Sequence, residues 1–184
     1  MKPPIANIKS CIEGDQRAQK ELYEDLKARV MGICYRYGHS KENAEDIFQD
    51  AIIRVFHNLQ KALHVDNFLA WVTRITVNTA ISHFKKSGAN MMVELNSSKA
   101  MDHTSHEVDV LESLQASEIL DLLYQLPDHY RVVFNLYMIE GYPHKDIAQQ
   151  LDIAESTSRV MLTRARKRMI ELIQKKTYYE NVAG

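Results

Sequence analysis

The stretch HKDIAQQLDIAESTSRVMLTRARK, residues 144–167, decides the fold of the second half of this chain. Small and apolar residues stand at the spacing of the first helix and turn of a helix-turn-helix: Ile147, Ala148, Leu151 and Ile153. The small side chain of Ala148 allows a second helix to cross closely over the first. That second helix repeats packing residues at steps of four, three, four and three: Ser158, Leu162, Ala165, Met169 and Leu172. The stretch therefore predicts a helix-turn-helix.

The opposite side of this second helix is polar and basic: Arg159, Thr163, Arg164, Arg166 and Lys167. Residues 159–176 hold seven Arg and Lys residues and one acid, Glu171. In a helix that enters the DNA major groove, side chains near the N-terminus reach base edges while later Arg and Lys residues hold phosphates. The helix dipole also favours basic residues at a helix end. Together with the helix-turn-helix spacing, however, the pattern predicts DNA contact.

Composition limits the class of protein. The 184 residues suffice for one ordinary domain or two small ones, and six Gly with four Pro favour helices over turn-rich β-structure. Proteins that bind DNA alone usually carry a basic surplus. Because the formal net charge here is −1, DNA contact must rest on a local patch or on a partner. The two cysteines, Cys11 and Cys34, predict reduced thiols, with Cys34 in a core, and no disulfide framework.

The sequence shows no sign of export or of a membrane anchor. No stretch approaches the ~20 apolar residues of a membrane span, and the first residues lack the apolar core of a signal peptide. We therefore expect a cytoplasmic protein without direct membrane insertion.

Helical periodicity divides the chain into three parts. It runs from residue 8 to 87, is interrupted over residues 88–112 by Gly, Asn, Ser, Asp and Thr, and returns over residues 113–176. No alternation is convincing enough for a sheet. The sequence therefore predicts an all-α protein in which a flexible linker (88–112) joins two small helical domains (8–87 and 113–176).

Three helices are predicted in the first domain. One spans residues 17–37, with Gly38 in the left-handed position that often follows a helix. A second begins after Ser40 as N-cap and buries an apolar stripe: Ala44, Ile47, Ala51, Val55 and Leu59. A third extends from Asp66, as N-cap, to Lys86 and has an apolar side: Phe68, Trp71, Val72, Ile75, Thr79 and Phe84.

Four helices are predicted in the second domain. The first spans residues 117–126, and Pro127 opens the next, which Gly141 ends after about residue 139. A short helix then extends to Leu151. After a turn over residues 152–154, a long helix spans residues 155–175.

Two helix surfaces in the first domain suggest binding. On the second helix, one polar side combines acids with an isoleucine: Asp46, Gln49, Asp50 and Ile53. This pattern fits a docking surface for a basic partner, although an ordinary solvated face has the same periodicity. The third helix combines basic with aromatic residues: Trp71, Arg74, Asn78, His83, Phe84, Lys85 and Lys86. Such a surface suits melted nucleic acid, where bases stack on rings, but Trp71 and Phe84 equally fit a structural role.

Six short motifs follow one another along the chain: NAEDIFQD (43–50), FLAWVTRI (68–75), NTA (78–80), LP (126–127), IA (147–148) and LTRARKR (162–168). In this order and at these separations, the chain resembles the extracytoplasmic-function group of bacterial sigma factors over residues 8–175. The resemblance implies sigma region 2 for the first domain and sigma region 4 for the second. It implies a protein that binds RNA polymerase core and directs promoter recognition, DNA melting and transcription initiation, and that is not an enzyme.

The resemblance also implies a role for each surface. Docking on the β′ clamp helices of the polymerase falls to Asp46, Gln49, Asp50 and Ile53. Recognition of the −10 element falls to residues 60–67 and to Arg74, Asn78, Lys85 and Lys86. Recognition of the −35 element, with region 4 resting on the β flap, falls to Ser156, Arg159, Thr163, Arg164, Arg166 and Lys167. An anti-sigma factor is a further implied partner, whereas no cofactor, metal or small-molecule substrate is implied.

The chain departs from the common pattern of this group at four positions. Ser156 stands where Gly is common, Ser158 where Val is frequent, and Met161 where Arg or another polar residue is frequent. In the turn, Asp152 replaces the usual Gly. These exchanges bear on the −35 sequence that is read more than on the fold.

Two other classes of protein remain open at this point. An ordinary helix-turn-helix repressor or activator would explain the residues after 113, but would leave the acidic face and the Trp71 helix without a role. A metal-dependent enzyme could draw its ligands from Asp102, His103, His106, Glu107 and Asp109. These residues lie in the predicted linker, however, and their spacing matches no standard zinc site.

Overall fold

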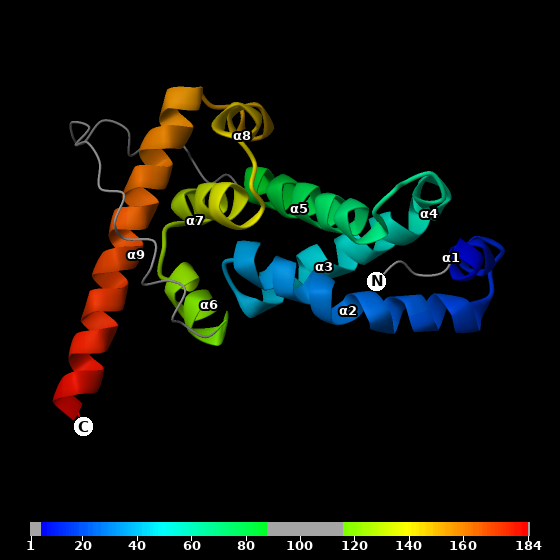
Figure 1. Ribbon diagram of the computed structural model, residues 1–184, viewed down its shortest axis with the longest axis horizontal. Helices are drawn as coiled ribbons and strands as arrows, with labels where there is room; N and C mark the ends of the chain where they lie inside the picture. Colours follow the sequence, from blue (N-terminus) through cyan, green and yellow to red (C-terminus); the bar gives the residue numbers. More distant parts are fainter. Residues whose placement is uncertain (1–4, 88–115, 184) are drawn as a thin grey trace. The chain divides into compact units, whose positions relative to one another are not determined.

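The computed structural model describes residues 5–87 and 116–183, and every regular element in these ranges is a helix (Figure 1). The chain forms two compact units, divided between Lys86 and Ser87. The all-α prediction is thereby confirmed. The predicted linker, residues 88–112, lies outside the described residues, and so do the five candidate metal ligands within it.

The first unit is built on three long helices, α2 (Gln16–Tyr37), α3 (Lys41–His57) and α5 (Phe68–Lys86). These helices pack against one another (Figure 1). The short helix α4 (Leu59–Ala62) connects α3 to α5, and α1 (Ile5–Ile12) lies against α2 and α4.

The apolar stripe predicted for α3 forms the centre of this packing. All five of its members are buried: Ala44, Ile47, Ala51, Val55 and, at the start of α4, Leu59. Full burial of a large aliphatic side chain stabilises a protein by about 1.5–3 kcal/mol. Cys34 of α2 is also in this core, as predicted, and burial raises the pKa of its thiol to about 12. The thiol therefore stays protonated and serves as a packing group.

Side-chain caps determine where the helices begin. Asp15 caps α2, and Ser40 caps α3 as predicted, because its Oγ accepts a hydrogen bond from a backbone N–H of the first turn at 3.1 Å. The predicted cap of α5, Asp66, is wrong. Oδ1 of Asn67 accepts the hydrogen bond from the backbone N–H of Ala70 at 3.0 Å, so the capping residue is one position later.

The glycine after α2 serves close packing instead of a left-handed turn. Gly38 has φ −62° and ψ 147°, an extended conformation that any residue can adopt. A Cβ at this position would lie 2.9 Å from Cβ of Ala44 and 3.0 Å from its backbone N. The predicted left-handed role is therefore wrong. Glycine is needed here because the chain crosses the first turn of α3 without room for a side chain.

We expect Gly38→Ala to lower the free energy of unfolding by about 1–3 kcal/mol, because the added methyl group forces the loop away from α3. Gly32→Ala is the matched control. A Cβ at Gly32, inside α2, would meet nothing within 4 Å, so this variant should gain about 0.5–1 kcal/mol. Urea denaturation followed by circular dichroism measures both effects. Equal changes in the two variants would contradict the packing account.

The second unit is built along one long helix, α9 (Glu155–Ala183). Three shorter helices pack along it: α6 (Ala116–Tyr124), α7 (Asp128–Phe134) and α8 (His144–Leu151) (Figure 1). One π-helical turn, η2 (Asn135–Ile139), directly follows α7. The helix thus ends at about residue 139, as predicted. The sequence placed the end of α6 near residue 126 and that of α9 near residue 175, so α6 is shorter and α9 longer than predicted.

Helices α8 and α9 form the predicted helix-turn-helix. The packing side of α9 is buried as expected: Ser158, Leu162, Ala165, Met169 and Leu172. Met161, which the spacing did not select, is buried beside them. In the turn, Asp152 adopts the left-handed conformation with φ 58° and ψ 50°. Asp tolerates this conformation better than most residues, so the exchange of the usual Gly leaves the turn intact.

Candidate functional site

The polar side of α3 lies on the surface of the first unit. Asp46 and Gln49 are exposed, Asp50 is half-exposed, and Ile53 is 55% exposed. These four residues are termed the α3 face below. Ile53 is the most exposed large hydrophobic side chain among the described residues, so the α3 face offers a partner both negative charge and an apolar contact.

Asp50 of the α3 face has a partner that the sequence analysis missed. Nε2 of His83, in α5, lies 2.8 Å from Oδ2 of Asp50, and the two side chains are 20% and 47% exposed. The residues are 33 positions apart, and no local spacing signals their contact. The contact fixes the orientation of the carboxylate and ties the α3 face to α5.

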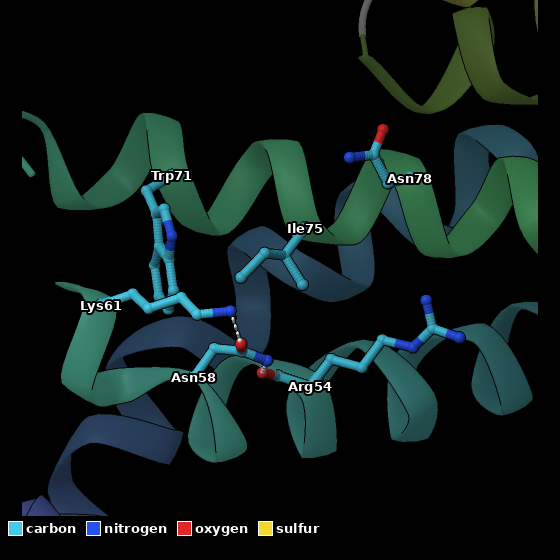
Figure 2. A pocket seen from close by; sticks show the side chains of 6 residues that line it. All are labelled: Arg54, Asn58, Lys61, Trp71, Ile75 and Asn78. Carbon is cyan, nitrogen blue, oxygen red and sulfur yellow. Dashed lines mark hydrogen bonds between the residues drawn. The ribbon is translucent and has the colours of Figure 1, made fainter. Parts of the chain in front are cut away.

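A hollow of about 270 Å³ opens between the end of α3, α4 and α5 (Figure 2). Six residues line it: Arg54, Asn58, Lys61, Trp71, Ile75 and Asn78. Nζ of Lys61 donates to Oδ1 of Asn58 at 2.8 Å, and Nδ2 of Asn58 donates to the carbonyl oxygen of Arg54 at 2.8 Å. The α3–α5 hollow thus combines an aromatic ring, two cations and two amides.

Trp71 belongs to both the packing and the hollow. Its ring stacks on Phe68, with ring centroids 5.7 Å apart and an interplanar angle of 30°. The side chain is nevertheless only half-buried, and Figure 2 shows it reaching from α5 toward Lys61. An aromatic ring beside a cation suits an unpaired base, which can stack on the ring while its phosphate meets the charge.

Of the residues predicted for the −10 element, Lys61, within the range 60–67, and Asn78 line the hollow. The other three predicted residues of α5 lie along the same helix. Arg74, Lys85 and Lys86 are exposed. Arg74 is one turn before Asn78 and Lys85 about two turns after it, so they lie on the same side of the helix. Two further polar residues of the hollow, Arg54 and Asn58, escaped the sequence analysis because polar residues on an exposed helix side look like ordinary solvated surface.

In the second unit, α9 presents most of its predicted DNA-binding residues on one exposed side: Ser156, Arg159, Thr163, Arg166 and Lys167. Arg159 forms an exposed ion pair with Glu155, one turn earlier. Arg164 differs from the others, since it is only half-exposed. Its Nη1 lies 3.5 Å from the hydroxyl of Tyr130 in α7, so this guanidinium turns toward the body of the unit.

A buried polar contact lies behind the exposed side of α9. Nδ1 of His144, at the start of α8, is 2.9 Å from Oγ of Ser158, and the two residues are 8% and 0% exposed. The His144 ring stacks on Tyr137, with centroids 4.4 Å apart and an angle of 24°. On the same tyrosine, the Arg166 guanidinium lies 5.8 Å from the ring centroid.

The environment of His144 favours the neutral imidazole. Burial lowers the pKa of His144 below its ordinary value, because a charged ring loses its hydration. The positive charges of Arg159 and Arg166 lower it further, whereas Glu155 acts in the opposite direction. In the neutral ring, depending on the tautomer, Nδ1 either accepts a hydrogen bond from the Ser158 hydroxyl or donates its own N–H to Oγ.

Known proteins match both units. Residues 22–89 match the family model of sigma-70 region 2, and residues 116–169 match that of sigma-70, region 4. The RNA polymerase sigma-H factor of Pseudomonas aeruginosa is 25% identical over 171 residues, which cover 88% of this chain and 89% of that protein. The ECF RNA polymerase sigma factor SigW of Bacillus subtilis is 28% identical over 170 residues, covering 87% and 91%. The chain belongs to the extracytoplasmic-function group of sigma factors.

A solved structure agrees with this fold. The sigma factor RpoE of Bartonella quintana, solved with the anti-sigma factor NepR, covers 84% of this chain with a TM-score of 0.50 and 21% identity, and 98% of its own length is matched. Membership of the family means that this sigma factor acts with RNA polymerase in promoter recognition and transcription initiation. The predicted family and function are confirmed, and the match to region 2 removes the repressor alternative. Within the described residues, no helix has the length and apolar character needed to cross a bilayer.

We expect the stability of region 4 to depend on the protonation of His144. Because its pKa is lower in the folded than in the unfolded protein, the unfolded state binds the proton first. The stabilisation is therefore fully present above about pH 6.5 and declines as the pH falls below this value. Urea midpoints between pH 7 and 5 should fall more steeply for the wild type than for His144→Phe, which cannot be protonated. The control is His57→Phe, a variant at an exposed position, whose midpoints should follow those of the wild type. If the midpoints of the wild type and of His144→Phe fall in parallel with pH, this account is contradicted.

Proposed function

We propose that region 2 of this sigma factor docks on the β′ clamp helices of RNA polymerase through the α3 face. We further propose that it opens the −10 element by capturing an unpaired base in the α3–α5 hollow, while region 4 reads the −35 element through α9. The observation that carries the proposal is the α3–α5 hollow, in which three elements bring a ring, two cations and two amides together.

The α3 face supplies the contact with the polymerase. Its acids complement a basic partner, and burial of Ile53 on docking adds a favourable apolar term of about 25 cal/mol per Å². His83 holds the Asp50 carboxylate in place before docking. Less side-chain freedom is then lost when the complex forms, which lowers the cost of association.

The α3–α5 hollow supplies the driving force for melting. Unstacking a base costs a few kcal/mol, by analogy with base flipping, and stacking on an aromatic side chain returns about 1–3 kcal/mol. Trp71 offers that ring, and the amides of Asn58 and Asn78 can bond the edge of a base. Arg54 and Lys61 attract the adjoining phosphates. Melting by capture needs no nucleotide hydrolysis, so the protein acts without being an enzyme.

The rest of α5 extends the charge along the opened strand. Arg74 is exposed between Trp71 and Asn78, two residues that line the hollow, and Lys85 and Lys86 are exposed beyond Asn78 toward the C-terminal end of α5. Phosphate contacts hold a strand in register without reading its sequence. These three residues therefore keep the melted strand on α5 while the hollow holds the base.

Region 4 supplies the second contact with the promoter while resting on the β flap. Near the N-terminal end of α9, Arg159 and Thr163 face base edges, and Ser156 lies where a helix N-terminus favours phosphate. Arg166 and Lys167 hold phosphates further along, and Arg164 adds charge at the rim. The polymerase fixes the separation of the two regions, so that two weak contacts gain through effective concentration. A net charge of −1 is compatible with this division of labour.

An anti-sigma factor is the regulatory partner in this proposal. RpoE of Bartonella quintana was solved with the anti-sigma factor NepR, and we propose that a protein of this kind holds the present sigma factor inactive. The site of action is the cytoplasm, where the polymerase works. Neither a cofactor nor a small-molecule substrate takes part.

Asp50→Arg should abolish binding to polymerase core, because it places a cation on a surface meant for a basic partner. Asp46→Arg should act in the same way without disturbing the contact to His83. Pull-down of purified core measures binding, and circular dichroism reports the fold. The matched control is Glu24→Arg, a charge reversal at an exposed position of α2, which should bind normally. Normal binding by the two α3-face variants would remove the docking assignment.

Trp71→Leu should lower the yield of open complexes on duplex promoters by about 5- to 150-fold, the factor that corresponds to a lost stacking energy of about 1–3 kcal/mol. Leucine retains an apolar contact with Phe68 but has no ring on which a base can stack. Permanganate reactivity of thymines near the start site measures melting. A template with a mismatched bubble at the −10 element should reduce the defect, since its bases are already unpaired. An equal defect on both templates would argue against capture as the source of melting.

A further inference from the structure

Ser158 places a buried hydroxyl on the packing side of α9. The residue is fully buried, and its Oγ lies 2.9 Å from Nδ1 of His144, itself 8% exposed. A buried hydroxyl or imidazole that loses its hydrogen-bond partner destabilises the protein. Each of the two residues therefore depends on the other, and their bond links α8 to α9 inside the helix-turn-helix.

The bond joins the two helices at the end of α9 that carries the base-reading side chains. His144 is the first residue of α8, and Ser158 is the fourth of α9, directly before Arg159. An α-helix with its side chains has a radius of about 5–6 Å, so a rotation of about 10° moves its surface groups by about 1 Å. Productive recognition geometry is held to about 0.5 Å. Small rotations of α9 are therefore enough to change which bases Arg159 reaches.

The same histidine also supports a second basic residue. Its ring stacks on Tyr137, and the guanidinium of Arg166 lies 5.8 Å from the centroid of the same tyrosine ring. Nη2 of Arg166 lies 3.0 Å from Sδ of Met138. Arg159 and Arg166 are seven residues apart and so share one side of α9. His144 thus lies behind the exposed side of α9 and has two links to it: its bond to Ser158, which precedes Arg159, and its stacking on Tyr137, which lies near Arg166.

We propose that His144 and Ser158 are a positioning pair for promoter selection: their hydrogen bond sets the rotation of α9 and thereby the −35 sequences that this sigma factor accepts. The proposal rests on the proposed role of α9 in reading the −35 element. Neither residue touches DNA, and both act through the placement of Arg159 and Arg166.

Transcription by core polymerase with the full-length chain, on a library of −35 sequences, tests the pair. Ser158→Ala removes the bond, and His144→Phe removes it while keeping a ring against Tyr137. Each should reduce the ratio of transcripts from the best and the poorest −35 sequences by a factor of up to about five, because one net hydrogen bond within the protein limits how strongly the placement of α9 can be biased. The double variant should lose little more than either single one, because both remove the same bond.

Two further variants separate positioning from loss of stability. His144→Asn keeps a polar atom near the position of Nδ1 but gives up the ring, so it should retain more of the wild-type preference than His144→Phe does. Leu172→Ala removes a buried side chain of the same helix, about 21 Å further along. It should lower transcription from all templates by one common factor and leave their ranking unchanged.

Reference variants keep the two proposals apart. Arg159→Ala should reorder the −35 sequences, whereas Lys167→Ala should weaken all of them alike; an unchanged ranking with Arg159→Ala would count against α9 as the reading helix. A wild-type preference in folded Ser158→Ala and His144→Phe would overturn the positioning pair and leave the proposed function standing. If Ser158→Ala does not fold, the comparison of His144→Phe with His144→Asn decides the question, and equal preferences in these two would also overturn the pair.

Discussion

Burial of one apolar side of each long helix is the constraint on which the structure depends. In α3, the buried stripe that includes Ala44 and Ile47 leaves Asp46 and Asp50 outside. In α9, the buried Ser158 and Leu162 leave Arg159 outside. A helix that packs through one side can offer only the other side to partners, so the contacts that stabilise each region also determine where the side chains proposed to face polymerase and DNA can stand.

Features that depend on neighbours along the chain could be predicted from the sequence. The periodicity identified the buried sides of α3 and α9, and Ser40 was correctly identified as a cap. The cap of α5 was misplaced by one residue because Asp and Asn are equally good N-caps and stand side by side there. Gly38 was misread for another reason. Its requirement for glycine comes from Ala44, six positions later, and steric contacts between segments leave no local pattern.

In the candidate site too, features within one helix could be predicted from the sequence, whereas contacts between helices could not. Its exposed residues were identified from spacing and from the resemblance to sigma factors, since each surface repeats along one helix. What the sequence could not supply were contacts that join different helices. The link between Asp50 and His83 is one of these, and the bond between His144 and Ser158 is another. The α3–α5 hollow also needs three elements to form. Such contacts orient the exposed side chains, so they determine the geometry that each surface presents to a partner.

The ion pair between Arg159 and Glu155 has a consequence for the search along the genome. In the free protein, a carboxylate of the same helix occupies the guanidinium that is proposed to read bases. Any DNA must first displace that carboxylate, at a cost of at most about 1 kcal/mol for an exposed pair. This cost is the same for every stretch of duplex. The free protein therefore binds random sequence and promoters alike up to about fivefold more weakly than it would with an unpaired Arg159, so it spends less time on the random duplex that makes up most of a genome.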